Sequence, residues 1–297
     1  MTALGQALQR GAGRLAAAGI ESPRLEARVL LAHAMAAAAN EVLTGRAPTA
    51  DEIARYDALV ERRAAHEPSA YLTGAREFWS LSFAVGPGVL IPRPDSETLV
   101  EAALAAFPDA PLEVLDLGTG SGCLLIAFLS ERPQARGTGV DISPEALAWA
   151  RENAALLGVA GRTQWRLGDW SGLPERRYDV ILANPPYLAL GDAVAPEISG
   201  HEPAGALYAG PDGLEAYRAL ACLLPTALRP DGLAFVEIGM GQSAATGALF
   251  AAQGIEIAAI RPDLAGVPRC LVLRLAAAGA AARWQTEKTV GKRQSRG

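Results

Sequence analysis

Seven short apolar segments, most of them separated by helix-length stretches, constrain the fold of this chain more than any other feature. Strands that alternate with helices form a mostly parallel sheet with helices on both faces. We therefore predict an α/β fold with a seven-stranded sheet. The predicted strands are Leu112–Leu117, Gly137–Ile142, Thr163–Leu167, Asp179–Ala183, Leu233–Ile238, Ile255–Ile260 and Cys270–Leu275. A short loop containing Pro and Gly joins the last two strands, which predicts that they pair antiparallel.

Residues 1–75 carry their apolar side chains at helical spacing. Leu4, Leu8 and Leu15 fall on one helical face, and Asp51–His66 shows the same period in a later segment. We predict a separate N-terminal domain that is a small helical bundle. Nothing in its sequence is typical of a catalytic site.

The spacing changes to that of strands in residues 76–92. The apolar runs Phe78–Val85 and Val89–Ile91 flank Gly86-Pro87-Gly88. Glycine and proline between two such runs predict a turn, so we expect a linking β-hairpin that turns at residues 86–88. The α/β domain then occupies residues 93–277.

The composition indicates a soluble globular protein. Half of the residues are hydrophobic and 20% are charged, and no apolar run approaches the roughly 20 residues of a membrane span. We expect no secretory signal and no membrane association, and we predict a cytoplasmic monomer. The net charge of −5 argues against a duplex-DNA enzyme, which usually has a basic face. The basic residues of 278–297 are predicted to form a disordered tail.

The cysteines and histidines are few and widely separated in the sequence. We therefore expect reduced cysteines, with neither a disulfide framework nor a metal site. These residues are Cys123, Cys222, Cys270, His33, His66 and His201.

A glycine-rich turn follows the first predicted strand of the sheet. It consists of Asp116, Leu117, Gly118, Thr119, Gly120, Ser121 and Gly122. Such a turn between a strand and a helix lets a ligand approach the backbone and the helix N-terminus. The G-x-G-x-G spacing differs from the G-x-G-x-x-G dinucleotide fingerprint. A tight turn without a ligand is the alternative interpretation.

Polar residues also end the second and third predicted strands. Asp141 lies 21 residues beyond Gly120, where a carboxylate can accept hydrogen bonds from both ribose hydroxyls, although capping of the next helix is an alternative. After the third strand, Asp169 is a candidate acceptor for an adenine amino group. Trp170 is a candidate to pack on the same ligand, or else a core residue.

The fourth predicted strand ends in Asn184-Pro185-Pro186-Tyr187, the most specific motif in the chain. Two prolines cannot continue a central strand, so the motif belongs at the carboxyl edge of the sheet, where open α/β sheets bind ligands. Asn184 Oδ1 and the Pro185 carbonyl can accept the two hydrogens of an NH₂ group. Pro186 fixes the extended geometry of Pro185, and Tyr187 can stack on a flat acceptor. A proline turn that merely closes a strand is the alternative.

With these motifs the chain resembles the HemK/PrmC family, the release factor glutamine N5-methyltransferases. The Asn-Pro-Pro-Tyr motif alone is shared with DNA-adenine and ribosomal-RNA guanine methyltransferases. Its combination with Ile91–Pro94 and the helical N-terminal region points to this family. The matching segments are Phe78-Trp79-Ser80, Leu90–Glu97, Asp116–Gly122, Gly168-Asp169-Trp170, Asn184–Tyr187, Glu202-Pro203, Ala206-Leu207, Gly213-Leu214 and Glu237-Ile238-Gly239.

The resemblance implies a Rossmann-like class I methyltransferase fold with S-adenosylmethionine as the cofactor. It assigns Gly118–Gly122, Asp141 and Trp170 to the cofactor. Asn184 is placed where cofactor and substrate meet, and Asn184–Tyr187 hold a glutamine. The implied partners are class I release factors, methylated in their Gly-Gly-Gln loop and docked with help from the N-terminal bundle. One departure is His201, where relatives usually carry Phe.

Three other functions are compatible with parts of the sequence. A nucleic-acid methyltransferase acting on adenine N6 or guanine N2 would need a flipped base and a basic approach surface, and the acidic charge balance disfavours it. A non-catalytic relative that binds a ribosomal partner is disfavoured by the intact glycine-rich turn and Asn184. The glycine spacing and the Asn-Pro-Pro-Tyr motif disfavour a nicotinamide oxidoreductase.

Overall fold

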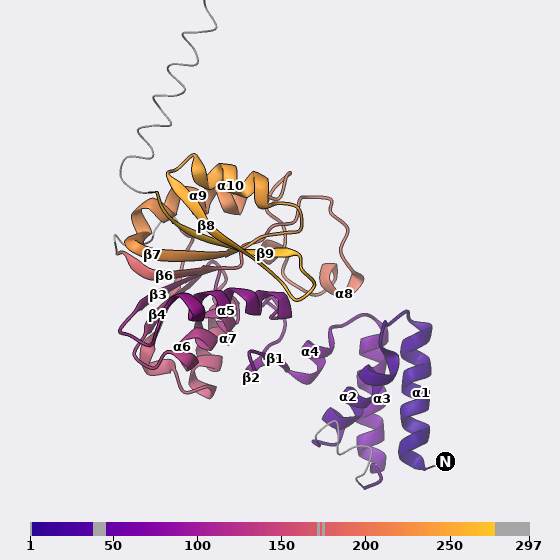
Figure 1. Cartoon of the computed structure of the whole chain (residues 1–297). Helices are drawn as coiled ribbons and strands as arrows, with labels where there is room; N and C mark the ends of the chain where they lie inside the picture. The colour runs from indigo at the N-terminus through magenta and orange to yellow at the C-terminus, as the bar shows by residue number, and fades with distance from the viewer. Residues whose placement is uncertain (1, 38–45, 171–172, 174–175, 277–297) are drawn as a thin grey trace, which may run out of the picture. The chain divides into compact units, whose positions relative to one another are not determined.

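The computed structural model describes residues 2–37, 46–170, 173 and 176–276 (Figure 1). Its chain divides into two compact units, a helical unit and an α/β unit. The helical unit comprises Met1–Arg76, Ala84–Ile91 and Ala193–Pro203, and the α/β unit comprises Glu77–Phe83, Pro92–Asp192 and Ala204–Gly297. The predicted disordered tail, 278–297, lies outside the described residues.

The helical unit is built from α1 (Ala3–Ala17), α2 (Pro23–Ala34), α3 (Ala50–Ala64) and the short α4 (Ser69–Thr73). Thr49 and Glu52 begin α3 with reciprocal side-chain and backbone hydrogen bonds, a capping box. Gly11 lets α1 approach α3 closely, because a Cβ added there would lie 1.8 Å from the Tyr56 hydroxyl. The prediction of a helical N-terminal region is confirmed.

Segment 193–203 belongs to the helical unit, although it follows the Asn-Pro-Pro-Tyr motif in sequence. It contains α8 (Pro196–Ser199). The buried Arg63 guanidinium of α3 pairs with Glu197 at 2.7 Å and with Glu26 at 3.3 Å. The buried Glu202 carboxylate accepts a hydrogen bond from the Ile91 backbone N–H at 3.0 Å. Ion pairs and backbone hydrogen bonds therefore attach this segment to its unit.

The linking hairpin is present, but the prediction of its turn was wrong. Its strands are β1 (Ala75–Phe78) and β2 (Leu81–Ala84), and the turn is formed by Trp79 and Ser80 rather than by residues 86–88. Trp79 and Ser80 have φ angles of 53° and 56°. A two-residue turn with two left-handed residues matches the twist of the flanking strands. The Glu97 carboxylate accepts a hydrogen bond from the Trp79 N–H at 2.8 Å, so a tertiary contact supports an unusual turn sequence.

The α/β unit contains the predicted seven-stranded sheet, in the order β5-β4-β3-β6-β7-β9-β8. Strands β3 to β7 run parallel, and β9 pairs antiparallel with both β7 and β8, as predicted. The strand bounds are β3 Glu113–Leu117, β4 Arg136–Asp141, β5 Thr163–Leu167, β6 Tyr178–Ala183, β7 Leu228–Glu237, β8 Ile255–Pro262 and β9 Pro268–Leu275.

Helices cover both faces of this sheet (Figure 1). They are α5 (Glu97–Ala106), α6 (Cys123–Glu131), α7 (Pro144–Leu156), α9 (Glu215–Ala227) and α10 (Ser243–Ala251). Successive residues of β3 enter different apolar clusters: Val114 packs with Leu99 and Phe128, whereas Leu115 packs in the cluster of Tyr217 and Phe250. This alternation follows from the two-residue period of a strand buried on both faces. No described helix is long and apolar enough to span a membrane.

Candidate active site

The candidate site lies where the strand order reverses, between β3 and β6. Leu117, the last residue of β3, pairs with Val140 of β4 on one side and Ala183 of β6 on the other. Gly118 and Asn184 are therefore the first residues after adjacent strand ends. Parallel strands thus bring the glycine-rich turn and the Asn-Pro-Pro-Tyr motif to one edge, where doubly wound sheets bind ligands.

Left-handed glycines shape the turn between β3 and α6. Gly118, Gly120 and Gly122 have φ angles of 71°, 55° and 80°, which residues with a Cβ rarely adopt. The Val140 carbonyl accepts hydrogen bonds from the N–H groups of Gly118 (2.9 Å) and Thr119 (3.0 Å). The turn is therefore fixed to the neighbouring strand through its backbone.

The underside of the turn is closely packed and contains several hydrogen bonds, although the buried Asp116 Oδ1 and Ser121 Oγ have no hydrogen-bond partner among the described residues. A Cβ on Gly122 would lie 3.1 Å from the Trp165 ring, so a larger residue does not fit without movement. Thr119 Oγ1 donates to the Asp116 carboxylate at 2.6 Å, and burial raises the pKa of Asp116 to about 7. The buried Asn153 side chain of α7 donates to the Ser121 carbonyl at 3.0 Å. These contacts hold the turn in place before any ligand binds.

Asp141 connects the turn to the loop after β4. Its Oδ2 accepts from the Gly120 N–H and its Oδ1 from the Ser143 N–H, both at 2.9 Å. The helix α7 is capped by Ser143, whose hydroxyl accepts from the Ala146 N–H at 3.0 Å. Asp141 is therefore not the cap of α7. Its half-buried carboxylate stands at the predicted ribose position, and that role remains a prediction.

The loop after β5 supplies the other two predicted cofactor residues. Asp169 is exposed, whereas Trp170 is half-buried and packs against the apolar cluster that contains Leu115. The Trp170 ring also borders the turn, because a Cβ on Gly118 would meet this ring at 3.9 Å and nothing closer. Both interpretations of Trp170 are thus compatible with the structure: part of the ring contributes to the core, and its edge limits the space above the turn.

The Asn184 side chain is held by a chain of hydrogen bonds. Asn184 Nδ2 donates to Ser96 Oγ at 3.0 Å, and Ser96 Oγ donates to Glu237 Oε2 at 2.5 Å. Ser96 and Glu237 are buried, while Asn184 is partly exposed. Within the described residues, neither Asn184 Oδ1 nor the Pro185 carbonyl accepts a hydrogen bond. Two acceptors are therefore left at the sheet edge.

The other end of the motif is held by Gln242. Gln242 Nε2 donates to the Tyr187 carbonyl at 2.9 Å, and Gln242 Oε1 accepts from the Gly239 N–H at 3.0 Å. Gly213 lies against the same carbonyl, since a Cβ there would be 2.4 Å from the Tyr187 oxygen. These contacts fix the Tyr187 backbone; its ring is half-buried, and burial raises the pKa of its hydroxyl.

Comparisons with known proteins identify relatives along most of the chain. A model of the PrmC N-terminal domain matches residues 6–74, and a methyltransferase domain model matches residues 108–237. The release factor glutamine methyltransferase of Cereibacter sphaeroides is 48% identical over 92% of this chain and 98% of its own length. That of Rhodospirillum rubrum is 42% identical over 93% of this chain and 86% of its own length.

The chain belongs to the release factor glutamine methyltransferase family.

One solved structure similar to this chain is the release-factor-specific protein-(glutamine-N5) methyltransferase of Alicyclobacillus acidocaldarius. It is 30% identical, covers 65% of this chain and 99% of its own, and has a TM-score of 0.39. The resemblance drawn from the sequence motifs is confirmed, as is the class I methyltransferase fold. The methyl donor of this family is S-adenosylmethionine.

Sequence reasoning missed the side chains that hold the family's Asn-Pro-Pro-Tyr motif. Ser96 and Glu237 stood out only as parts of matching segments, without a role, and Gln242 did not stand out. Ser96 lies 88 residues from Asn184, Glu237 lies 141 residues from Ser96, and Gln242 lies 55 residues from Tyr187, so only the fold brings each pair together. The sequence did offer one signal for Glu237: a carboxylate at the end of an apolar strand is unusual, and could have indicated a functional role.

No three His, Cys, Asp or Glu side chains in the described ranges are grouped to hold a metal ion. The buried carboxylates instead serve hydrogen bonding. Burial raises the pKa of Glu237 to about 7, and the Ser96 hydroxyl and the Arg269 charge oppose that shift. Arg269 also pairs with Asp95 and Asp263, each at 3.1 Å.

Proposed function

We propose that this chain transfers a methyl group from S-adenosylmethionine to the side-chain amide nitrogen of the glutamine in the Gly-Gly-Gln motif of class I release factors. The observation that carries this proposal is the held Asn184 amide, whose Oδ1 is left as an acceptor beside the Pro185 carbonyl. Two acceptors of this kind suit the two hydrogens of a primary amide. The relatives are named release factor glutamine methyltransferases, which supports the choice of substrate.

The residues around the turn fit the cofactor. Gly118 has open space above its backbone, bounded by Trp170, as close approach of a ligand requires. We assign Gly118–Gly122 to the cofactor backbone contacts, Asp141 to the ribose hydroxyls and Asp169 to the adenine amino group. Trp170 would pack on the bound cofactor. When bound, S-adenosylmethionine supplies an electrophilic methyl group on a sulfonium.

The protein's contribution to the reaction is orientation. An amide nitrogen is a poor nucleophile because its lone pair is delocalised into the carbonyl. Acceptors at Asn184 Oδ1 and the Pro185 carbonyl would fix the NH₂ group and favour a pyramidal nitrogen, while Tyr187 stacks on the amide plane. Pro186 keeps Pro185 extended, so the acceptors do not rearrange. Once the nitrogen has gained the methyl group, it would lose one proton to water, and no general base is assigned.

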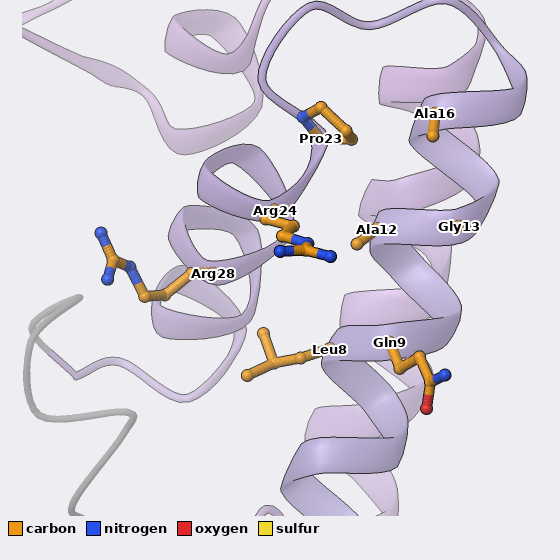
Figure 2. A pocket seen from close by; sticks show the side chains of 8 residues that line it. All are labelled: Leu8, Gln9, Ala12, Gly13, Ala16, Pro23, Arg24 and Arg28. Atoms are coloured by element: carbon orange, nitrogen blue, oxygen red, sulfur yellow. The ribbon is translucent and has the colours of Figure 1, made fainter.

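The helical unit is proposed to dock the release factor. A groove of about 820 Å³ lies between α1 and α2 and is lined by small and apolar residues of α1 (Figure 2). Arg24 and Arg28 line it from α2, and neither forms an ion pair with another described residue. A basic rim beside an apolar groove suits an acidic amphipathic segment of the protein substrate.

Replacing both groove arginines tests the docking role. Arg24→Gln/Arg28→Gln is expected to raise KM for an intact release factor about 5–30-fold, because charges at an interface rim each contribute on the order of 0.5–1 kcal/mol. KM for a short Gly-Gly-Gln peptide should not change. The matched control, Arg10→Gln/Arg14→Gln, removes the same charge from the same unit outside the groove and should leave both KM values unchanged. Equal losses on protein and peptide would exclude docking at this groove.

Labelled-methyl transfer tests the proposed activity directly. Purified release factors, DNA and ribosomal RNA are offered in parallel as acceptors, and mass spectrometry locates the methyl group. We expect label on the Gly-Gly-Gln glutamine alone. Label on nucleic acid, with release factors unmodified, would contradict the proposal. Since release factors act in translation, we place the enzyme in the cytoplasm, and we propose that it works as a monomer.

A further inference from the structure

The Ser96 hydroxyl forms hydrogen bonds with Asn184 and Glu237 although Ser96 lies at the start of a helix. Serine at that position usually accepts a hydrogen bond from a backbone N–H of the first turn. Here Ser96 precedes α5 and makes no such cap. It is buried, with its Oγ 2.5 Å from Glu237 Oε2 and 3.0 Å from Asn184 Nδ2. Both partners lie far from Ser96 in sequence, so tertiary structure holds the hydroxyl between them.

The hydrogens available on Glu237, Ser96 and Asn184 determine which group donates and which accepts in each hydrogen bond between them. A hydroxyl has one hydrogen, and an ionised carboxylate can only accept. Ser96 must therefore donate to ionised Glu237, which leaves only its lone pairs for Asn184. The Asn184 side chain must then present its NH₂ to Ser96 and its Oδ1 to the opposite side.

The opposite orientation of the Asn184 amide would defeat the proposed reaction. With the amide reversed, its NH₂ would face the substrate NH₂, and two donors do not hydrogen-bond each other. Asparagine alone has no strong preference, because its oxygen and nitrogen ends have nearly the same shape. The neighbouring groups must supply the choice.

We propose that Ser96 and Glu237 are positioning residues that orient the Asn184 amide with Oδ1 toward the glutamine to be methylated. This proposal rests on the proposed function and adds to it two residues that do not themselves touch the substrate. The ionised Glu237 carboxylate makes Ser96 donate to it, and Ser96 can therefore only accept a hydrogen bond from the Asn184 NH₂.

The groups around Glu237 place the ionisation of its carboxyl near neutral pH. Burial raises its pKa to about 7, Arg269 and Arg93 favour the ionised form, and Asp95 opposes it. Protonated Glu237 can donate to Ser96, which frees the Ser96 hydroxyl hydrogen. Ser96 could then donate to Asn184 Oδ1, and the Asn184 amide would be turned with its NH₂ toward the substrate. The other titratable groups coupled to Glu237 are Tyr187, Tyr217, Cys123 and Cys270.

The first test is Ser96→Ala in the full chain, assayed with a Gly-Gly-Gln peptide. We expect kcat to fall about 10–100-fold, less than the roughly 10²–10³-fold loss when a transition-state hydrogen bond is removed outright, because Ser96 acts only through Asn184. Cofactor Kd by calorimetry and peptide KM should stay within about threefold of wild type. The control is Thr246→Val, which removes another buried hydroxyl that bonds only to carbonyls of its own helix start. Full turnover of Ser96→Ala, with cofactor bound normally, would overturn the proposal.

The second test is the pH dependence of kcat, which a merely structural role would not produce. Wild-type kcat should rise with pH along a limb near pH 7, because ionisation of Glu237 imposes the productive direction. Glu237→Gln keeps the volume but cannot ionise, so its kcat should be lower and this limb absent. Persistence of the same limb in Glu237→Gln would overturn the role of Glu237.

These outcomes are distinguishable from failure of the proposed function. If wild-type protein labels no release factor peptide at any pH, the proposed function itself fails. If the wild type methylates the glutamine and both variants match it in kcat and pH profile, the activity stands and the positioning role is wrong.

Discussion

The two sides of the site are built by different means. On the cofactor side, left-handed glycines and backbone hydrogen bonds to Val140 shape the turn, and the Asp141 and Asn153 side chains add hydrogen bonds to its backbone. On the acceptor side, the Asn-Pro-Pro-Tyr motif is held by side chains, Ser96 and Gln242, from distant segments.

This difference has a physical reason and a consequence. A ligand that approaches a backbone closely needs space and fixed N–H and C=O groups, which local sequence can supply. An amide substrate needs acceptors with one orientation, and an asparagine side chain acquires that only from its neighbours. We therefore expect changes on the acceptor side to affect kcat, and changes on the cofactor side to affect cofactor Kd or folding.

The largest expected effect comes from Asn184→Leu. It roughly keeps the volume but removes the acceptor, and should lower kcat toward the glutamine peptide by about 10²–10³-fold. Calorimetry should show little change in cofactor Kd. Asn184→Asp keeps acceptor oxygens and should retain part of the activity. A Leu variant that turns over at the wild-type rate would make Asn184 a strand-end residue only.

An intermediate effect is expected for Asp141→Ala. If Asp141 bonds the ribose as a charged acceptor, its loss should weaken cofactor binding by about 1.5–3 kcal/mol, or roughly 10–150-fold in Kd. With saturating cofactor, kcat should change far less than it does in Asn184→Leu. An unchanged Kd in a folded variant would remove Asp141 from the cofactor site. A loss seen in kcat alone would contradict the division between the two sides.

The smallest expected effect is the difference in stability between Gly122→Ala and its control Gly158→Ala. Gly122 has a φ of 80° and an added Cβ would lie 2.9 Å from Ile126 and 3.1 Å from Trp165, so we expect a loss of about 1.5–3 kcal/mol in unfolding free energy. Gly158→Ala is the matched control, because its φ is 74° and nothing lies within 4 Å of the added Cβ. It isolates the backbone cost, about 1–2 kcal/mol. Equal losses in denaturant melts would show that the packing under the turn tolerates a methyl group.

The α/β architecture was predictable from the sequence because its signals are local. Most of the seven strands are apolar runs bounded by breakers, and the short loop between the last two predicted their antiparallel pairing. The family was predictable for a similar reason, since its motifs are short continuous segments such as Asn184–Tyr187. The hairpin turn was mispredicted because Gly86-Pro87-Gly88 is the stronger local turn signal. The fold places the turn at Trp79 and Ser80, where Glu97 binds the Trp79 N–H.

By itself, then, the sequence determined the order of strands and helices, the glycine-rich turn and the identity of the acceptor motif. Only the tertiary structure decided what holds that motif. Ser96, Glu237 and Gln242 come from separate parts of the chain, and no periodicity relates them to Asn184 or Tyr187. The physical reason is that strand and helix patterns report which residues are buried. Hydrogen-bond direction depends on which buried groups meet, and that is fixed when the sheet brings β6 and β7 side by side.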